Sequence, residues 1–182
     1  METNSPEQPV DWQEPDWRRE QPRRFWDPSR KLLRSLRDYQ RLQGTGWVRR
    51  IRRSACVIRH HFWSVVTGAE IPLNCQIEGG LLLPHPNGVV CHPEAKIGPN
   101  CLLFQQVTLT EGVILGAHVD VGAGAKVLGP LELADHVRIG ANSVVLQSVP
   151  AGCTAVGVPA EIVRRPNATD VESFNHAEGD SH

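Results

Sequence analysis

A six-residue repeat of branched apolar residues constrains the fold of this chain more than any other feature. Its key positions are Ile71, Ile77, Leu83 and Val89, and, after one step of eight residues, Ile97, Leu103, Leu109, Leu115, Val121, Val127, Leu133, Ile139 and Val145. Glycine directly follows several of them, at Gly98, Gly116, Gly122 and Gly140. An α-helix would spread these positions over every face, and a simple alternation would not require the glycines. The repeat therefore predicts short strands joined by tight corners.

Such a repeat cannot bury its apolar side alone, but stacked coils can. Three hexapeptides close one triangular coil of 18 residues, with the first apolar residue of each pointing inward. We therefore predict an all-β core over residues 69–165, a parallel β-helix of about five coils. Residues 18 apart then lie above one another at about the 4.8 Å spacing of neighbouring strands.

One column of this stack carries the candidate chemistry. Its third positions are His85, Gln105, Ala123 and Ala141, and its second positions add Gly122 and Gly140. A histidine at the foot of a bare track suits a long, thin acyl-thioester cofactor, whose arm could bond to backbone amides. Pro84 and Pro86 restrict the backbone that presents the histidine.

Residues 26–68 show helical spacing instead. Asp27-Pro28 predicts a helix start, and Leu32, Leu33, Leu36 and Tyr39 follow at helical spacing up to Gly44. A second helix, from about Gly46 to Val66, has one apolar side made of Val48, Ile51, Ala55, Ile58, Phe62 and Val65. Its arginines lie largely elsewhere. We interpret it as a helix packed on the body of the protein with a solvated basic face. Binding to an anionic membrane or to nucleic acid is the alternative, which no aromatic platform or groove-reading motif supports.

Charge and composition narrow the remaining possibilities. The net charge is −1, yet 14 of the 19 lysines and arginines precede residue 67. Residues 1–25 and 166–182 are polar without periodicity, so we predict disordered tails. No run of about 18 uncharged apolar residues and no signal-peptide pattern is present, which favours a cytoplasmic protein without a transmembrane segment. The five cysteines include no Cys-x-x-Cys pair. We therefore predict buried thiols rather than disulfides or a zinc site.

Three segments resemble the hexapeptide-repeat acyltransferases and, among them, the serine O-acetyltransferases. They are LLLPHPNGVVCHPEAKIG around His85, CLLFQQVTLT from Cys101 to Thr110, and VGAGAKVLG with IGANSVVLQSVPAGCTAVGVPAEIV near the end. The resemblance covers about half of the chain. It implies a left-handed β-helix, acetyl-CoA as the acetyl donor, and a homotrimer with active sites between neighbouring β-helices.

The resemblance also implies roles for individual residues. His85 would be the general base that takes the proton of an acceptor hydroxyl while its oxygen attacks the thioester directly. Glu70, fifteen places earlier, would orient His85 where the family usually has Asp. The CoA would be flanked by Gln105, Gly122, Ala123, Gly140, Ala141, Gly157 and Pro159, and Lys126 is a candidate partner of its phosphates.

The chain departs from the family pattern near the acceptor. The glycine-rich loop that carries an Arg-His pair is missing, because VTLTEGVILGAHVDVG continues the repeat. Thr110 replaces a glycine, Gly112 stands where the histidine would align, and Pro84 replaces an acidic residue. The short N-terminal part favours a trimer over a hexamer. Docking to cysteine synthase is unsupported, because the chain does not end in isoleucine.

Three functions stay open from the sequence. The first is O-acetylation of L-serine or a close analogue, which we prefer. The second is acetylation of a sugar hydroxyl in polysaccharide or natural-product biosynthesis. The third is a non-enzymatic or metal-binding β-helix, since His118 and His136 are one coil apart. Their spacing with His85 and His92 does not reproduce the zinc triad of the carbonic anhydrases on this scaffold, so we expect no metal. We expect no nucleic-acid partner.

Overall fold

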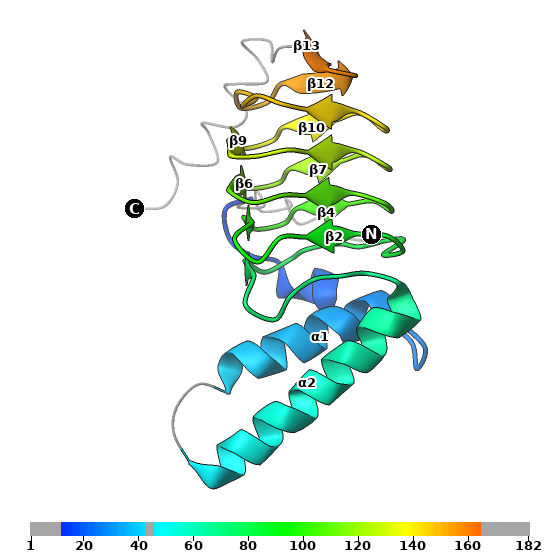
Figure 1. Cartoon of the computed structure of the whole chain (residues 1–182), viewed down its shortest axis with the longest axis vertical. Coiled ribbons are helices and arrows are strands. Elements are labelled where there is room, and N and C mark those ends of the chain that lie inside the picture. The colour runs from blue at the N-terminus through cyan, green and yellow to red at the C-terminus, as the bar shows by residue number, and fades with distance from the viewer. Residues whose placement is uncertain (1–11, 43–45, 165–182) are drawn as a thin grey trace, which may run out of the picture.

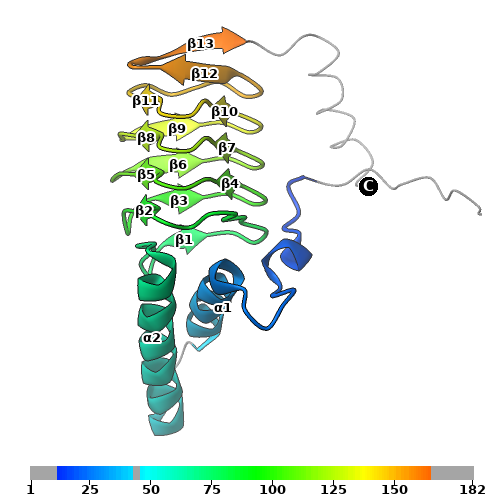
Figure 2. The ribbon, with the colours of Figure 1, turned by 90° about the vertical axis from the view of Figure 1, so that its right-hand side faces the viewer.

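The computed structural model describes residues 12–42 and 46–164. A tall β-helix stands on a pair of helices, as Figures 1 and 2 show from two sides. The elements ahead of the β-helix are the 3-10 helix η1 (Trp17–Glu20), α1 (Pro28–Arg41) and α2 (Trp47–Thr67). No helix in the described ranges is both long enough and apolar enough to cross a membrane.

The β-helix has three parallel sheets, one for each side of the prism. The first contains β1 (Gln76–Ile77), β3 (Lys96–Ile97), β6 (Val113–Leu115) and β9 (Leu131–Leu133). The second contains β4 (Leu102–Leu103), β7 (Asp120–Val121), β10 (Arg138–Ile139) and β12 (Thr154–Gly157), with β13 (Ala160–Arg164) antiparallel at its end. The third contains β2 (Val90–Cys91), β5 (Thr108–Leu109), β8 (Lys126–Val127) and β11 (Val144–Val145).

Each sheet stacks four parallel strands, where we predicted about five coils. The incomplete turns at the two ends contribute only isolated bridges, Glu70 to Val90, Leu82 to Leu102 and Leu133 to Val149. The second residue of each two-residue strand is buried while the first is at least partly exposed, so the inward column is apolar throughout. The predicted six-residue repeat therefore forms the core as expected.

The register of the strands locates the irregular step of the repeat. Leu82 pairs with Leu102, 20 residues later, whereas Val90 pairs with Thr108, 18 residues later. The lowest turn therefore holds two extra residues in segment 83–89, the corner that contains His85.

This position corrects our prediction, which set the long step between Val89 and Ile97. The inward residue of β2 is Cys91, which aligns with Leu109. Val89 and Cys91 are both buried, at 0% and 2% exposure. Apolarity alone could therefore not decide which of them starts the next step.

The two helices pack on each other and on the base of the β-helix. Asp27 is the N-cap of α1 and Pro28 follows, as predicted, and Leu32, Leu33 and Leu36 are each 1% exposed. Gly68 ends α2 in the left-handed conformation, with φ +66°.

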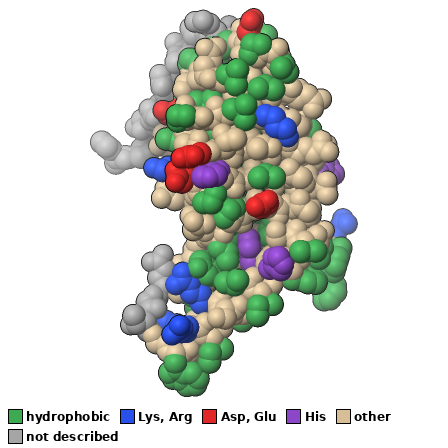
Figure 3. Space-filling model, in the orientation of Figure 1, with side chains coloured by type: hydrophobic (Ala, Val, Ile, Leu, Met, Phe, Trp, Pro, Cys, Tyr) green, Lys and Arg blue, Asp and Glu red, His purple; other side chains and the backbone are tan. Residues whose placement is uncertain are grey.

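The buried face of α2 is not the one we predicted. The side that faces α1 and the β-helix carries Cys56, His60, Trp63 and Thr67, at helical spacings of four, three and four. The predicted apolar side is exposed, for example 59% at Ile51, 71% at Ile58 and 70% at Val65. Figure 3 shows hydrophobic side chains beside Lys and Arg at the helical end of the molecule. The buried side is the more polar of the two, because His60 contacts the Ser35 hydroxyl of α1 and the Ile71 carbonyl, so apolarity did not indicate which side packs.

Residues 12–27 also differ from the prediction of a disordered tail over 1–25. Asn100 accepts a hydrogen bond from the Asp16 backbone N–H (2.9 Å) and donates to the carbonyls of Trp12 (3.0 Å) and Glu14 (2.8 Å). The segment therefore lies along the lower coils, as Figure 2 shows. The tails predicted over 1–11 and 166–182 fall outside the described residues.

A buried ion pair fixes the end of this segment. Arg37 of α1 donates to both carboxylate oxygens of Glu20, at 3.0 and 2.8 Å, and to the backbone carbonyls of Ile77 and Glu78. Glu20 also accepts from the backbone N–H of Leu81 at 3.1 Å. The pair thus joins η1, α1 and the first corner of the β-helix.

Candidate active site

The predicted site residues converge on one edge of the prism. This edge, the His85 edge, consists of the corners between the second and third sheets, segments 84–89, 104–107, 122–125 and 140–143. Backbone hydrogen bonds join successive corners, from Gln106 to Asn87, from Gly124 to Gln105 and from Asn142 to Ala123. By this register Asn87, Gln105, Ala123 and Ala141 occupy equivalent positions. The predicted column therefore does not begin at His85, which lies two residues earlier in the enlarged corner of the same edge, because that corner holds the two extra residues.

His85 is exposed on the lowest and longest corner. The chain leaving α2 lies directly beneath it, because the Gly88 N–H donates to the Gly68 carbonyl at 2.8 Å. Gly88 has φ +71°, and a Cβ there would meet Gln106 at 3.1 Å. The enlarged corner therefore depends on glycine to turn, and it presents the imidazole to solvent.

Glu70 lies on the same side, under the strand that leaves this corner. Its N–H donates to the Val89 carbonyl at 2.8 Å, and its carbonyl accepts from Cys91 at 2.9 Å. The side chain is exposed, like that of His85. No side-chain hydrogen bond links Glu70 to His85 in the described part of the chain.

The glycines of the track have a structural reason of their own. A Cβ on Gly122 would lie 2.7 Å from the backbone of Ala141, and one on Gly140 would lie 2.6 Å from the side chain of Val156. The same glycine recurs at a different edge, where a Cβ on Gly98 would lie 2.4 Å from the carbonyl oxygen of Gly116. Glycine at this position is thus required by coil stacking and does not by itself indicate a cofactor.

Ala123, Ala141 and Gln105 are more informative about a ligand. Ala123 is half-buried and Ala141 is exposed, so the upper part of the edge is free of large side chains. The amide oxygen of Gln105 is buried without a hydrogen-bond partner in the described part of the chain. Because an unpaired buried acceptor is costly, a donor from a bound molecule would stabilise this corner.

Lys126 and the final hairpin flank the track. The Lys126 ammonium donates to the Gln106 carbonyl at 2.6 Å, so it lies over the corner directly above that of His85. Gly157 has φ +107°, and its N–H donates to the Ser143 hydroxyl at 3.1 Å. The turn that contains Gly157 and Pro159 therefore caps the upper end of the His85 edge.

A cleft of about 620 Å³ opens beside His85. The 84–87 corner and the end of α2 form one wall, and residues 23–30 form the other. Arg23, Arg24 and Trp26 line this second wall. Sequence reasoning missed these residues because it placed most of the segment in a disordered tail. The arginine pair before Phe25-Trp26 was a signal that could have been noticed.

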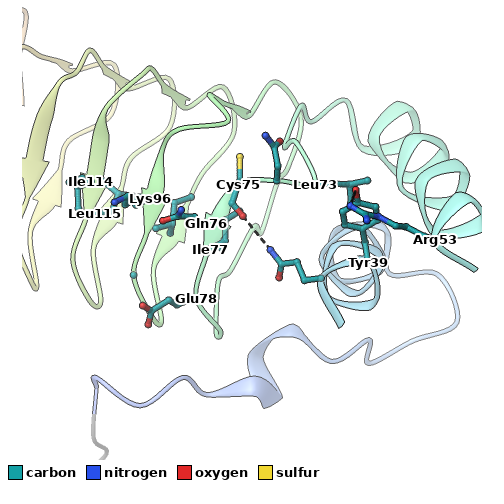
Figure 4. Close-up of a pocket in the computed structure, with 14 residues that line it drawn as sticks. Tyr39, Arg53, Leu73, Cys75, Gln76, Ile77, Glu78, Lys96, Ile114 and Leu115 are labelled. Carbon is teal, nitrogen blue, oxygen red and sulfur yellow. Dashed lines mark hydrogen bonds between the residues drawn. The ribbon is translucent and has the colours of Figure 1, made fainter. Parts of the chain in front are cut away.

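A larger groove, about 870 Å³, lies on a different side, between the first sheet and the helices. Figure 4 shows Gln76, Lys96 and Ile114 from the sheet and Tyr39 and Arg53 from the helices around it. It contains none of the predicted site residues and no histidine.

The stacked histidines at the edge between the first and second sheets form no recognisable metal centre. The rings of His118 and His136 lie 5.1 Å apart between centroids, and Trp12 meets the ring of His136 edge-on at 4.4 Å. Burial, together with neighbouring His118, lowers the pKa of His136. In the described ranges no group of three or more His, Cys, Asp or Glu side chains is arranged to hold a metal ion.

The five cysteines are buried free thiols, as predicted. Burial raises the pKa of Cys75 to about 11 and that of Cys101 to about 12. Because the thiolate is the reactive form, these residues are unsuited to nucleophilic catalysis.

Comparison with known proteins identifies the relatives of this chain. The serine acetyltransferase of Synechococcus elongatus is 38% identical over 126 residues, which cover 65% of this chain and 51% of that protein. The serine acetyltransferase of Staphylococcus aureus strain Mu50 is 40% identical over 124 residues, 60% of this chain and 55% of that protein. This chain is a relative of the serine acetyltransferases. No protein-family model matches it.

Solved structures of serine acetyltransferases extend this relationship to the fold. The enzyme from Vibrio cholerae matches with a TM-score of 0.66 at 30% identity, over 82% of this chain and 58% of that chain. A serine acetyltransferase in complex with CoA matches with a TM-score of 0.59 at 31% identity, over 76% of this chain and 58% of that chain. The predicted left-handed parallel β-helix is thus confirmed. This chain spans about half the length of the curated relatives it matches.

Proposed function

We propose that this chain transfers the acetyl group of acetyl-CoA to the hydroxyl of L-serine, with His85 as the general base. The observation that carries the proposal is the His85 edge, an exposed histidine at the foot of a track of small residues. The resemblance to serine acetyltransferases, one of them solved with CoA and another with serine, supports the choice of donor and acceptor. A cytoplasmic location would fit this donor.

The reaction needs no covalent enzyme intermediate. A neutral imidazole of His85 accepts the proton of the acceptor hydroxyl while the oxygen attacks the thioester carbonyl carbon. The resulting tetrahedral intermediate collapses, the carbon–sulfur bond breaks, and the CoA thiolate takes the proton from the imidazolium. The products are the O-acetyl ester and free CoA, and His85 returns to its neutral form. Glu70 would act as a positioning residue that favours the imidazolium.

The track would hold the donor. Backbone amides at the Ala123 and Ala141 corners are open to the arm of CoA, and the amide oxygen of Gln105 needs a donor. Lys126 would move from the Gln106 carbonyl to a CoA phosphate, because a charge-assisted hydrogen bond is stronger than one to a neutral acceptor.

We also propose that the chain assembles as a homotrimer. The exposed apolar side of α2 supports self-association, because a contiguous apolar surface on a soluble domain commonly marks an interface. Light scattering of the purified protein tests this, with three times the mass of one chain expected. A monomeric mass that stays constant over a hundredfold range of concentration would contradict it.

An acceptor panel tests the reaction. Thiol release from acetyl-CoA would be followed with L-serine, L-homoserine and nucleotide sugars, and the product would be identified by mass spectrometry. L-serine is expected to give the highest kcat/KM. A nucleotide sugar preferred over L-serine would instead support the sugar acetyltransferase, which no contact in the structure favours.

A further inference from the structure

The cleft beside His85 carries positive charge that the proposed reaction does not yet use. Three arginines line it, Arg23, Arg24 and Arg30, and Asp27 is its one acidic side chain. His85 lies on the opposite wall. An acceptor entering this cleft would therefore meet cationic groups and the base together.

Asp27 does not neutralise all three arginines. Its carboxylate accepts from the Arg30 guanidinium and from the Arg23 backbone N–H, both at 3.1 Å. Arg30 also donates to the Arg19 carbonyl at 2.8 Å, so its guanidinium is engaged within the segment. Desolvation raises the pKa of Asp27, but these hydrogen bonds outweigh it and the net pKa is lowered. The carboxylate is thus ionised and is paired with Arg30.

The guanidinium groups of Arg23 and Arg24 have no such partner. Both side chains are exposed, and among residues 12–42 and 46–164 no carboxylate pairs with either of them. Two formal positive charges consequently face the cleft without compensation.

The segment that carries the two arginines is anchored on both sides. Trp26 packs edge-on against Trp63 of α2, with ring centroids 5.7 Å apart. Asp27 is the N-cap residue of α1 and holds the Arg23 backbone. The arginine pair therefore occupies a defined wall of the cleft.

We propose that Arg23 and Arg24 bind an anionic group of the acetyl acceptor, the carboxylate if the acceptor is L-serine. This inference rests on the function proposed above, because it assumes that the acceptor occupies the His85 cleft. A guanidinium offers paired N–H donors that match the two oxygens of a carboxylate or the oxygens of a phosphate. Binding of the anion on one wall places the acceptor hydroxyl against His85 on the other.

A double variant, Arg23→Gln with Arg24→Gln, tests the site. The KM for L-serine should rise about 10- to 100-fold, which corresponds to loss of hydrogen bonds between charged groups. The KM for acetyl-CoA should change by less than about threefold, because the track is built from other residues. The matched control is Arg50→Gln with Arg52→Gln, two exposed arginines on α2 that do not line the cleft. It should leave both constants unchanged.

A second set of measurements uses an acceptor that lacks the anionic group. Serinol keeps the hydroxyl and amine of serine but lacks the carboxylate, so its KM should be the same in wild type and in the double variant. If the KM for a phosphorylated acceptor rises in the double variant as much as the KM for L-serine does, the two arginines form a general anion site rather than a carboxylate-specific one. An unchanged KM for L-serine in a folded double variant would overturn the inference.

Binding measured without turnover separates this inference from the proposed function. Calorimetry would compare L-serine binding to wild type and to the double variant, each saturated with CoA. Binding that is lost in the variant supports the anion site even if no acetyl transfer occurs. Serine turnover with equal binding by both proteins leaves the function standing and refutes the site. Absence of both binding and turnover in the wild type refutes both.

Discussion

At the scale of single residues, two extra positions in one corner account for the placement of His85. The other three corners of the His85 edge span four residues each, whereas segment 84–89 spans six. The longer corner holds the ring out in solvent, and Gly68 and Gly88 bring the chain beneath it into hydrogen-bonding distance. The two prolines that flank His85 limit the backbone freedom of this enlarged turn.

The first residue-level prediction concerns the orienting carboxylate. Glu70→Gln keeps the shape of the side chain but removes the charge that would favour the His85 imidazolium. We expect a smaller loss of kcat than in His85→Ala, and a double variant less impaired than the product of the two losses, because the groups act as a unit. Steady-state kinetics measure this. Multiplicative losses would show that Glu70 acts independently of His85.

The second residue-level prediction concerns the donor track. Ala141→Trp should abolish CoA binding, because an indole would fill the exposed corner along which the cofactor arm would run. The inward column of the core would be unaffected. Calorimetric titration with CoA checks this. Gln147→Trp is the control, at an exposed corner of the same turn on a different edge. A folded Ala141→Trp protein that binds CoA normally would refute the track.

At the scale of elements, the N-terminal segment is joined to the β-helix by polar contacts instead of a large apolar surface. The Glu20–Arg37 pair is buried, with side-chain exposures of 6% and 9%. A buried pair contributes little relative to an apolar replacement, but removal of one partner leaves an uncompensated charge. The pair therefore fixes the position of residues 12–27 against the first coil.

Arg37→Ala should lower the free energy of unfolding by about 3–5 kcal/mol, because Glu20 would stay buried without its partner. Urea unfolding followed by circular dichroism measures the change. Arg18→Ala removes the exposed pair with Asp16 and should change the free energy of unfolding far less than Arg37→Ala does. Equal effects of the two substitutions would show that the Glu20 contact is not buried in solution.

The packing of α2 on α1 predicts sensitivity to acid. Burial lowers the pKa of His60, outweighing its hydrogen bonds with backbone groups, and the ring contacts the Ser35 hydroxyl (2.9 Å) and the Ile71 carbonyl (2.8 Å). Below pH of about 6.5 the unfolded chain binds a proton at this histidine that the folded chain does not. The free energy of unfolding therefore falls as pH decreases from about 7 through this window.

The test is the slope of stability against pH in His60→Gln. The slope should become smaller but not vanish, because the lowered pKa of His136 contributes with the same sign. His61→Gln, at an exposed neighbouring position, should keep the wild-type slope. A His60→Gln protein with the wild-type slope would contradict the assignment.

The repeat and the helices could be predicted from the sequence because their signals are local. Branched residues such as Leu103 and Val121 recur at fixed spacing, and Asp27-Pro28 marks the start of α1. The rotation of α2 could not be predicted, because the side that packs against α1 includes the polar residues His60 and Thr67, whereas the more apolar side is exposed. Nor could the wall formed by Arg23 and Arg24, because residues 12–27 are held by the Asn100 side chain and the buried Glu20, contacts without periodicity. The His85 edge followed from stacking, yet the position of its long corner did not.

At the scale of the whole molecule, three parts meet at one place. The β-helix carries the proposed track and the proposed base, the end of α2 lies beneath them, and the segment before α1 carries the proposed cationic wall. Figure 1 shows the two helices below the lowest coils of the β-helix. The proposed acetyl transfer thus uses the junction of the two halves of the chain, with the donor along the prism and the acceptor at its base.

The rate of L-serine-dependent thiol release from acetyl-CoA by His85→Ala, compared with wild type, tests this account most directly. If His85 is the base, kcat should fall by about 10²–10⁴-fold, the usual effect of losing a general base. The affinity for acetyl-CoA should change little, since the track is built from other residues. A His85→Ala protein that retains near-normal turnover would contradict the central claim.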